Sequence, residues 1–228
     1  MKQMVQIAID GPVGAGKGTV ARLVAERLGI LYVDTGAMYR AAALIAKRAG
    51  VSGEDEVRIA KLVDQAKIEL RQPQGEERDG RLITVIVDNE DVSWKIRTEE
   101  MSQGSAVVSK HPQVRAVLVQ KQQTMAKKQS VIMEGRDIAY RVLPEANLKI
   151  YLTADEQERA RRRFKQMQER GIESTFEKVL LDIKWRDAQD FGRKTDPLKM
   201  VKGAWLLDTT GMTIEGVVDK IVRRGKNL

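Results

Sequence analysis

A glycine-rich loop near the start of the chain constrains the fold more than any other feature. The loop spans residues 11–19 and reads GPVGAGKGT. It follows the short β-branched stretch 5–10 and opens into residues 20–29, where apolar residues recur at helical spacing before a glycine. A strand, a glycine loop and a helix in this order predict a phosphate-binding loop. Glycines let successive N–H groups point at phosphate oxygens, and the helix N-terminus adds positive potential.

The residue types in the loop favour nucleotide binding over an unliganded β–α turn. Four glycines accompany Lys17, whose mobile charge suits the β- and γ-phosphates, and Thr19. The common form of the motif has a hydroxyl directly after the lysine, but here Gly18 takes that place. This variant is similar to the loop of nucleoside-monophosphate kinases. The predicted nucleotide contacts are Gly11, Pro12, Val13, Gly14, Ala15, Gly16, Lys17, Gly18 and Thr19.

Composition narrows the class of partner. The chain has 40 basic and 32 acidic residues, a net charge of +8, which favours nucleic acid, a membrane surface or phosphorylated metabolites. Only 4% of residues are aromatic, which argues against stacking on single-stranded nucleic acid. The chain has no cysteine and its one histidine is His111, so cysteine-bound metals are excluded and a histidine metal site is disfavoured. With no long apolar run and no signal peptide before the first strand, we expect a cytoplasmic protein with no membrane or nucleic-acid partner.

Strands alternate with helices along the chain, which predicts an α/β fold. Further apolar stretches that we interpret as strands occur at residues 30–34, 130–134, 148–152 and 205–208. We therefore expect a single domain over residues 1–228, with a five-stranded parallel sheet flanked by helices. Residues 67–93 differ in character, because short alternating stretches separated by turns predict a small antiparallel insertion.

Three sets of polar residues follow predicted strands or share a helix face. Arginines beside a phosphate loop offer bidentate donors for a second phosphate, an arrangement suited to phosphoryl transfer between two nucleotides. A basic helix within residues 156–171 is a candidate lid; a solvated helix face is its alternative. The third set could instead form ion pairs along its own helix. The three sets are Thr35, Tyr39 and Arg40; Arg136 and Asp137; and Arg186, Asp190 and Arg193.

Taken together, the motifs resemble those of the bacterial cytidylate kinases in order and spacing. The resemblance covers essentially the whole chain, with residues 36–110 as the monophosphate-binding region, the β insertion at 67–93 and the lid at 156–171. The motifs are the loop 11–19, DTGAMYR at 34–40, Pro112-x-Val114-Arg115, Gly135-Arg136-Asp137, the arginine-rich lid, Arg186-Asp187-x-x-Asp190-x-x-Arg193, Pro197-Leu198 and Asp208-Thr209-Thr210.

The resemblance implies ATP-dependent phosphorylation of CMP and dCMP with Mg²⁺, by a monomer. It implies catalytic roles for Lys17, Arg159 and Arg163, and a metal site at Thr19 and Asp34, partly through water. The implied substrate contacts are Thr35, Arg40, Arg136 and Arg193 at the acceptor phosphate, Arg115 and Asp137 at cytosine, and Arg186 and Asp190 at the sugar. Tyr39 and Ser105 are expected as further substrate-binding residues.

The chain departs from the family pattern near the base. The serine that helps hold cytosine in relatives aligns with Ala106, beside Ser105, and Tyr140 stands where a small residue is usual. A kinase for another acceptor, such as UMP or AMP, therefore stays open. A nucleic-acid-binding protein with a phosphate loop and a nucleotide-binding regulator are further alternatives, but both leave the ordered arginine and aspartate sets unexplained.

Overall fold

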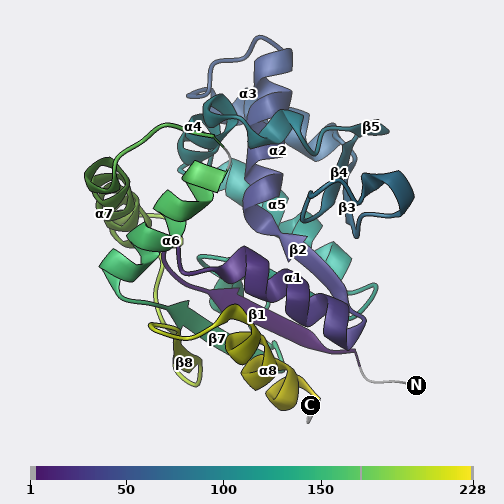
Figure 1. Cartoon of the computed structure of the whole chain (residues 1–228). Helices are drawn as coiled ribbons and strands as arrows, with labels where there is room; N and C mark the ends of the chain where they lie inside the picture. Colours follow the sequence, from purple (N-terminus) through teal and green to yellow (C-terminus); the bar gives the residue numbers. More distant parts are fainter. Residues whose placement is uncertain (1–3, 170, 227–228) are drawn as a thin grey trace. The chain divides into compact units, whose positions relative to one another are not determined.

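A computed structural model describes residues 4–169 and 171–226, which form two compact units (Figure 1). The loop unit comprises residues 5–29 and 134–226 and contains the glycine-rich loop. The insertion unit comprises Ile30–Met133 and contains the predicted β insertion. The expected division into a single domain with a monophosphate-binding region and a lid stays a prediction, and Arg170, within the expected lid, lies outside the described residues.

The loop unit is built on parallel strands covered by helices. Strand β1 pairs with β7, and β7 pairs with β8, each in parallel. Helices α1 and α8 pack side by side, as do α6 and α7 (Figure 1). The elements are β1 (Gln6–Asp10), α1 (Lys17–Leu28), η3 (Ile138–Val142), β7 (Leu148–Thr153), α6 (Glu156–Glu169), α7 (Phe176–Gly192), β8 (Trp205–Asp208) and α8 (Ile214–Gly225).

The insertion unit combines four helices with a small antiparallel sheet. Helix α2 packs on α4, and α3 packs on α5. Strand β6 (Val131–Gly135) crosses the boundary between the units. The elements are β2 (Leu31–Asp34), α2 (Thr35–Arg48), α3 (Glu56–Gln65), β3 (Ile68–Arg71), η1 (Gly75–Glu77), β4 (Thr84–Val87), β5 (Glu90–Asp91), η2 (Lys95–Arg97), α4 (Glu99–Val108) and α5 (Pro112–Ala126).

The predicted fold class is confirmed. The parallel sheet has five strands in the order β2-β6-β1-β7-β8, and helices connect them. On its central strands β1 and β7, the apolar residues Ile7, Ile9, Ile150 and Leu152 have no exposed surface. The sequence predicted the strands but not their order, which depends on contacts between residues far apart in the chain. No helix of the described residues is long and apolar enough to cross a membrane.

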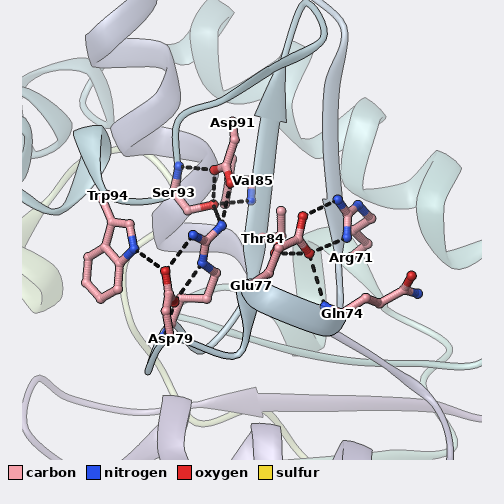
Figure 2. Close-up of polar contacts among 10 residues, drawn as sticks. Arg71, Gln74, Glu77, Asp79, Thr84, Val85, Asp91, Ser93 and Trp94 are labelled. Carbon is pink, nitrogen blue, oxygen red and sulfur yellow. Dashed lines mark hydrogen bonds and ion pairs between the residues drawn. The ribbon is translucent and has the colours of Figure 1, made fainter.

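The β insertion combines buried apolar side chains, among them Ile83, Val85 and Val92, with a network of ion pairs. Strands β3, β4 and β5 form an antiparallel sheet, as predicted for residues 67–93. Glu77 accepts hydrogen bonds from Arg71, the backbone of Gln74 and Thr84, while Arg81 pairs with Asp79 and Asp91 (Figure 2). Each labelled carboxylate in Figure 2 therefore accepts from an arginine of the insertion. These bonds fix the shape of the loops between the three strands.

Candidate functional site

The phosphate loop has the geometry its glycines predict. Gly14 and Gly16 adopt left-handed backbone angles, φ 75° and 87°, which glycine reaches without strain. Gly11 lies so close to β7 that an added Cβ would be 2.0 Å from the carbonyl oxygen of Leu152. The loop ends at the N-terminus of α1, whose first N–H groups have no partner within the helix. This turn presents backbone donors and positive potential where a phosphate would bind.

Lys17 is buried and bound to its own loop. Its Nζ donates hydrogen bonds to the carbonyl oxygens of Gly11 at 2.7 Å and Pro12 at 2.8 Å. Burial, and then the positive charge of Arg136, lower the pKa of Lys17 below its ordinary value. Because both partners are neutral carbonyls, a phosphate would offer this ammonium a stronger acceptor.

Asp10 joins the phosphate loop to the segment after β6. Its carboxylate accepts hydrogen bonds from the backbone N–H groups of Ile138 and Ala139, both at 2.8 Å. Burial raises the pKa of Asp10 to about 6, even though those two N–H groups act in the opposite direction. Asp10 thereby holds the start of η3 next to the end of β1.

The loop unit brings four of the predicted substrate residues into one charged cluster. Arg136 forms an ion pair with Asp190, and Arg193 Nη2 lies 3.7 Å from Asp137 Oδ1. Arg193 also donates from Nε to the carbonyl oxygen of Asp196 at 2.6 Å. The charges of Arg136 and Asp190 both act on the pKa of Lys17, so this cluster lies within electrostatic range of the loop lysine.

The ion pairing proposed as an alternative for the third set is wrong. Arg186 pairs with Asp182, one turn earlier in α7, at 3.0 Å, rather than with Asp190. Asp190 pairs with Arg136 instead, and Arg193 lies at the C-terminal cap of α7. The spacing placed Arg186 and Asp190 on one helix, but it could not predict a partner 54 residues away.

The two lid arginines differ in their surroundings. Arg159 is only 6% exposed and forms an ion pair with Asp187 at 2.6 Å. It also donates to the carbonyl oxygens of Val13 at 2.9 Å and Ala154 at 3.0 Å. Arg163, one turn later in α6, is half-buried and donates to Gln166 Oε1 at 2.8 Å. Arg159 is therefore fixed against the phosphate loop, whereas Arg163 contacts only its own helix in the hydrogen bonds described.

In the insertion unit, two arginines share one buried carboxylate. Asp34 caps α2 by accepting from the backbone of Ala37, and its Oδ2 lies 2.9 Å from Arg40 and 3.6 Å from Arg97. Burial opposes ionisation of Asp34, but the two guanidinium groups outweigh it and hold its pKa below the ordinary value. Within the described part of the chain, the buried atoms Arg40 Nε and Arg97 Nη2 have no hydrogen-bond partner. Two positive charges at a helix N-terminus thus face one negative charge.

The remaining predicted residues of this unit lie on three helices. The Arg115 guanidinium lies over the Tyr39 ring, 5.5 Å from its centre, and Arg115 donates to the carbonyl oxygen of Ser109 at 3.2 Å. Arg115 is almost fully buried, at 1% exposure. Thr35 is the first residue of α2, and Ser105 donates to the carbonyl oxygen of Ser102 within α4 at 2.8 Å. The structure therefore joins Tyr39 to Arg115 and leaves Ser105 bonded to its own helix.

The residues present fit a magnesium ion only in part. No group of three or more histidine, cysteine or acidic side chains among the described residues could hold a metal. Thr19 lies in the first turn of α1, where its hydroxyl could reach a nucleotide-bound ion. Asp34 does not fit the role predicted for it, because its carboxylate already binds two guanidinium groups and a helix N-terminus.

Comparison with known proteins identifies the family. The family model for cytidylate kinase matches residues 7–227. The chain belongs to the cytidylate kinase family. It is 48% identical to the cytidylate kinase of Caldanaerobacter subterraneus subsp. tengcongensis, covering 95% of this chain and 92% of that one. It is 46% identical to the cytidylate kinase of Lactobacillus gasseri, covering 96% and 92%. A crystal structure of an uncharacterized protein from Eubacterium ventriosum shares the fold, with a TM-score of 0.53, 12% identity, and coverage of 99% of this chain and all of that one.

Sequence reasoning missed three charged residues that contact predicted site residues or the segments next to them. Asp10 ends β1, Arg97 ends η2, and Asp187 lies within α7. Asp187 lies in the motif RDxxDxxR, yet nothing in the motif indicated a role for it. An acidic residue at the end of a buried strand was a usable signal for Asp10. Arg97 carried none, because its partner Asp34 lies in a distant segment.

Proposed function

We propose that this chain transfers the γ-phosphoryl group of ATP to CMP or dCMP, giving CDP or dCDP and ADP. The observation that carries the proposal is membership of the cytidylate kinase family over residues 7–227, together with an intact phosphate loop. The charged cluster of the loop unit and the arginine pair of the insertion unit supply the cations that two nucleotides require. Phosphoryl transfer asks a protein chiefly for positioning and charge stabilisation, which these groups provide.

The donor phosphates would bind at the loop. Backbone N–H groups of the loop and the N-terminus of α1 would hold them, and Lys17 would exchange its two carbonyl acceptors for phosphate oxygens. Arg163 is the lid residue we assign to the transferring phosphoryl group. Mg²⁺ would be held by Thr19 and by the nucleotide itself, and it would offset negative charge on the phosphates.

The acceptor phosphate would bind to arginines. We assign it to Thr35, Arg40, Arg136 and Arg193, and we add Arg97 because its buried Nη2, 3.6 Å from Asp34, has no hydrogen-bond partner among the described residues. These cations offset the repulsion between the two anionic nucleotides. No general base is needed, since the acceptor phosphate is largely ionised near neutral pH. Removing the charge of any one of them should weaken acceptor binding first.

The base and sugar would be read by polar side chains. Asp137 would accept from the exocyclic amine of cytosine, whereas uracil offers a carbonyl there and would be repelled. Arg115 is rigidly buried against Tyr39, which fixes its donors for the ring, and Ser105 is assigned beside it. Arg186 and Asp190 are assigned to the sugar. Ala106 cannot make the contact to the cytosine ring that the serine of relatives makes. We therefore expect discrimination against UMP to be the weakest part of the specificity.

We further propose that the enzyme acts as a cytoplasmic monomer with no nucleic-acid or membrane partner. The absence of cysteine and the fit of the basic side chains to nucleotide phosphates support this assignment. Sedimentation of the purified chain with and without ATP tests it. A stable dimer at micromolar concentration would contradict the monomer assignment.

An ADP-release assay with ATP, Mg²⁺ and separate acceptors tests the function. CMP, dCMP, UMP and AMP are compared in parallel. We expect turnover with CMP and dCMP, and turnover with UMP at least about 10-fold lower, because one mismatched polar contact costs roughly 1–3 kcal/mol. Comparable turnover of UMP would show relaxed specificity near Ala106. A folded protein that binds ATP but turns over none of the four would overturn the kinase assignment.

A further inference from the structure

The α6–α7 helix pair holds the phosphate loop at a single residue, Val13. Asp187 Oδ1 accepts from the Val13 backbone N–H at 3.2 Å, and Arg159 Nη1 donates to the Val13 carbonyl oxygen at 2.9 Å. The same Arg159 nitrogen donates to Asp187 Oδ2 at 2.6 Å, which closes a ring of hydrogen bonds. Both peptide groups of Val13 are therefore fixed by one ion pair.

Apolar packing holds the same part of the loop. The Val13 side chain packs against a buried cluster formed by Ala160 of α6 and Val179 and Ile183 of α7. At the next residue, a Cβ added to Gly14 would lie 3.2 Å from both the Cβ and the carbonyl oxygen of Arg159. The loop backbone thus lies directly against α6, and there is little room for it to shift.

The Arg159–Asp187 ion pair is buried where it contacts Val13. Arg159 is 6% exposed and Asp187 9% exposed, and the Arg159 Nε donates to the carbonyl oxygen of Ala154. Removing one member of a buried ion pair leaves the other uncompensated, so the loss would be transmitted to the loop peptide groups that the pair holds. Arg159 makes these contacts through Nε and Nη1, so both of these nitrogens are engaged in holding the loop and the ion pair.

We infer that Arg159 and Asp187 are positioning residues that fix the phosphate loop at Val13. They hold the N–H groups that follow Val13 in the orientation that donor phosphates require. The inference rests on the proposed function only in taking ATP as the ligand of the loop. It gives Arg159 a different role from the direct contact with the transferring phosphoryl group that the family resemblance implies.

Binding of ATP to Asp187→Asn, Arg159→Lys and the double variant tests the inference. Calorimetric titration with ATP and Mg²⁺, without an acceptor, gives each Kd, and steady-state assays give KM and kcat. We expect each single variant to raise the Kd and KM for ATP by about 10- to 100-fold, because a small misplacement of a binding group costs this much. The KM for CMP should change by less than about 2-fold. The double variant should bind ATP no more weakly than the weaker single variant, since the two residues act as one unit.

Two results would overturn the inference. If Asp187→Asn binds ATP as the parent does while Arg159→Lys lowers kcat, Arg159 acts on the phosphoryl group directly. If both variants melt at lower temperature yet keep the parent Kd for ATP below the transition, the pair is merely structural. Should Asp187→Asn fail to fold, the Kd of Arg159→Lys alone decides between these outcomes.

The matched control is Lys184→Ala. Lys184 pairs with Glu156 at 3.4 Å, so this ion pair also joins α7 to α6, but its members are half exposed and the structure gives them no bond to the loop. Exposed pairs contribute about 0–1 kcal/mol, so the control should keep the parent Kd for ATP. Because ATP binding is measured without an acceptor, a wrong assignment of CMP as substrate would leave this test intact and appear only in the turnover assay.

Discussion

Arg159 of the loop unit differs from Arg40 and Arg97 of the insertion unit in how many of its donors have a described acceptor. In the loop unit, Arg159 donates hydrogen bonds to Asp187, Val13 and Ala154, and no second arginine is described in a pair with Asp187. In the insertion unit, Arg40 and Arg97 both pair with Asp34. Each also has one buried nitrogen that makes no hydrogen bond among the described residues. A buried donor without an acceptor costs free energy, so such a pair persists where a ligand supplies the acceptor.

The difference separates two uses of the same side chain. A guanidinium whose Nε and Nη1 donate to backbone carbonyl groups and to a carboxylate orients the backbone around it, as Arg159 does for the loop. A guanidinium with donors to spare beside a helix N-terminus is prepared for an anion, as we propose for Arg97. Counting protein acceptors therefore distinguishes positioning arginines from binding arginines, which residue type and spacing cannot do.

Lys17 is the residue most able to break this comparison. Its Nζ donates to the carbonyl oxygens of Gly11 and Pro12, yet we expect it to bind phosphate, because those acceptors are neutral and belong to its own loop. Lys17→Ala should lower kcat by about 10³-fold, the loss typical of removing one charge-stabilising donor. Burial lowers the pKa of Lys17, which means that burying its charge opposes folding, so the variant should stay folded.

Turnover of CMP and thermal unfolding of Lys17→Ala measure the two effects separately. Arg22→Ala is a suitable control, because this residue lies on the same helix and pairs at the surface with Glu26. If Lys17→Ala is folded and its turnover is near that of the parent, Lys17 only holds the loop through its two carbonyl acceptors. The assignment of Lys17 to the donor phosphates would then be wrong.

Arg97 tests whether an arginine with unbonded donors binds the acceptor nucleotide. Arg97→Ala should raise the KM for CMP by about 10- to 100-fold, since a hydrogen bond to a charged group contributes roughly 1.5–3 kcal/mol, while the KM for ATP stays unchanged. The control is Lys95→Ala, two residues earlier in η2, where the lysine is exposed and pairs with Glu90. Parallel KM measurements for CMP and ATP test this. An unchanged KM for CMP with a lower melting temperature would make Arg97 only a structural partner of Asp34.

Much of the fold could be predicted because it depends on local patterns. The strands at β1, β6, β7 and β8 are short apolar stretches, and the loop glycines at 14 and 16 adopt the left-handed angles that only glycine accepts easily. The antiparallel insertion at 67–93 was equally visible, since alternation and turns are read from neighbouring residues. These features need no information about distant segments.

The partners of the site residues could not be predicted in the same way. Asp34 was expected at a metal, but Arg97, 63 residues further on, occupies its carboxylate. Arg159 was expected at the phosphoryl group, but its ion pair is with Asp187, 28 residues away. Helical spacing suggested that Arg186 pairs with Asp190, and the competing neighbour Asp182 has the bond. Long-range pairing decides which charges are left for a ligand, and it follows from the tertiary structure alone.

Asp10 gives the smallest expected effect. It tests whether a buried carboxylate bonded only to the backbone changes the free energy of unfolding with pH. Burial raises its pKa to about 6 in the folded protein, above the ordinary value of 3.8, so the folded state holds the proton more tightly than the unfolded state. The contribution of Asp10 to stability is therefore largest below pH 4 and falls as the pH rises through 6. Between pH 5 and 7 it should lower the free energy of unfolding by about 1 kcal/mol.

Denaturant unfolding at pH 5, 6 and 7 measures this loss. Glu77 and Glu90, whose pKa values are lowered to about 2, change stability below pH 5. Burial lowers the pKa of Lys17 to about 7, so near pH 7 its loss of a proton raises stability and opposes the decline, and the comparison with Asp10→Asn separates the two groups. In Asp10→Asn, which cannot titrate, the decline should disappear, although overall stability also falls because the amide can accept only one of the two N–H bonds. An identical decline in the parent and the variant would assign it to another group. Asp10 would then be bound to the backbone without a measurable cost of burying its charge.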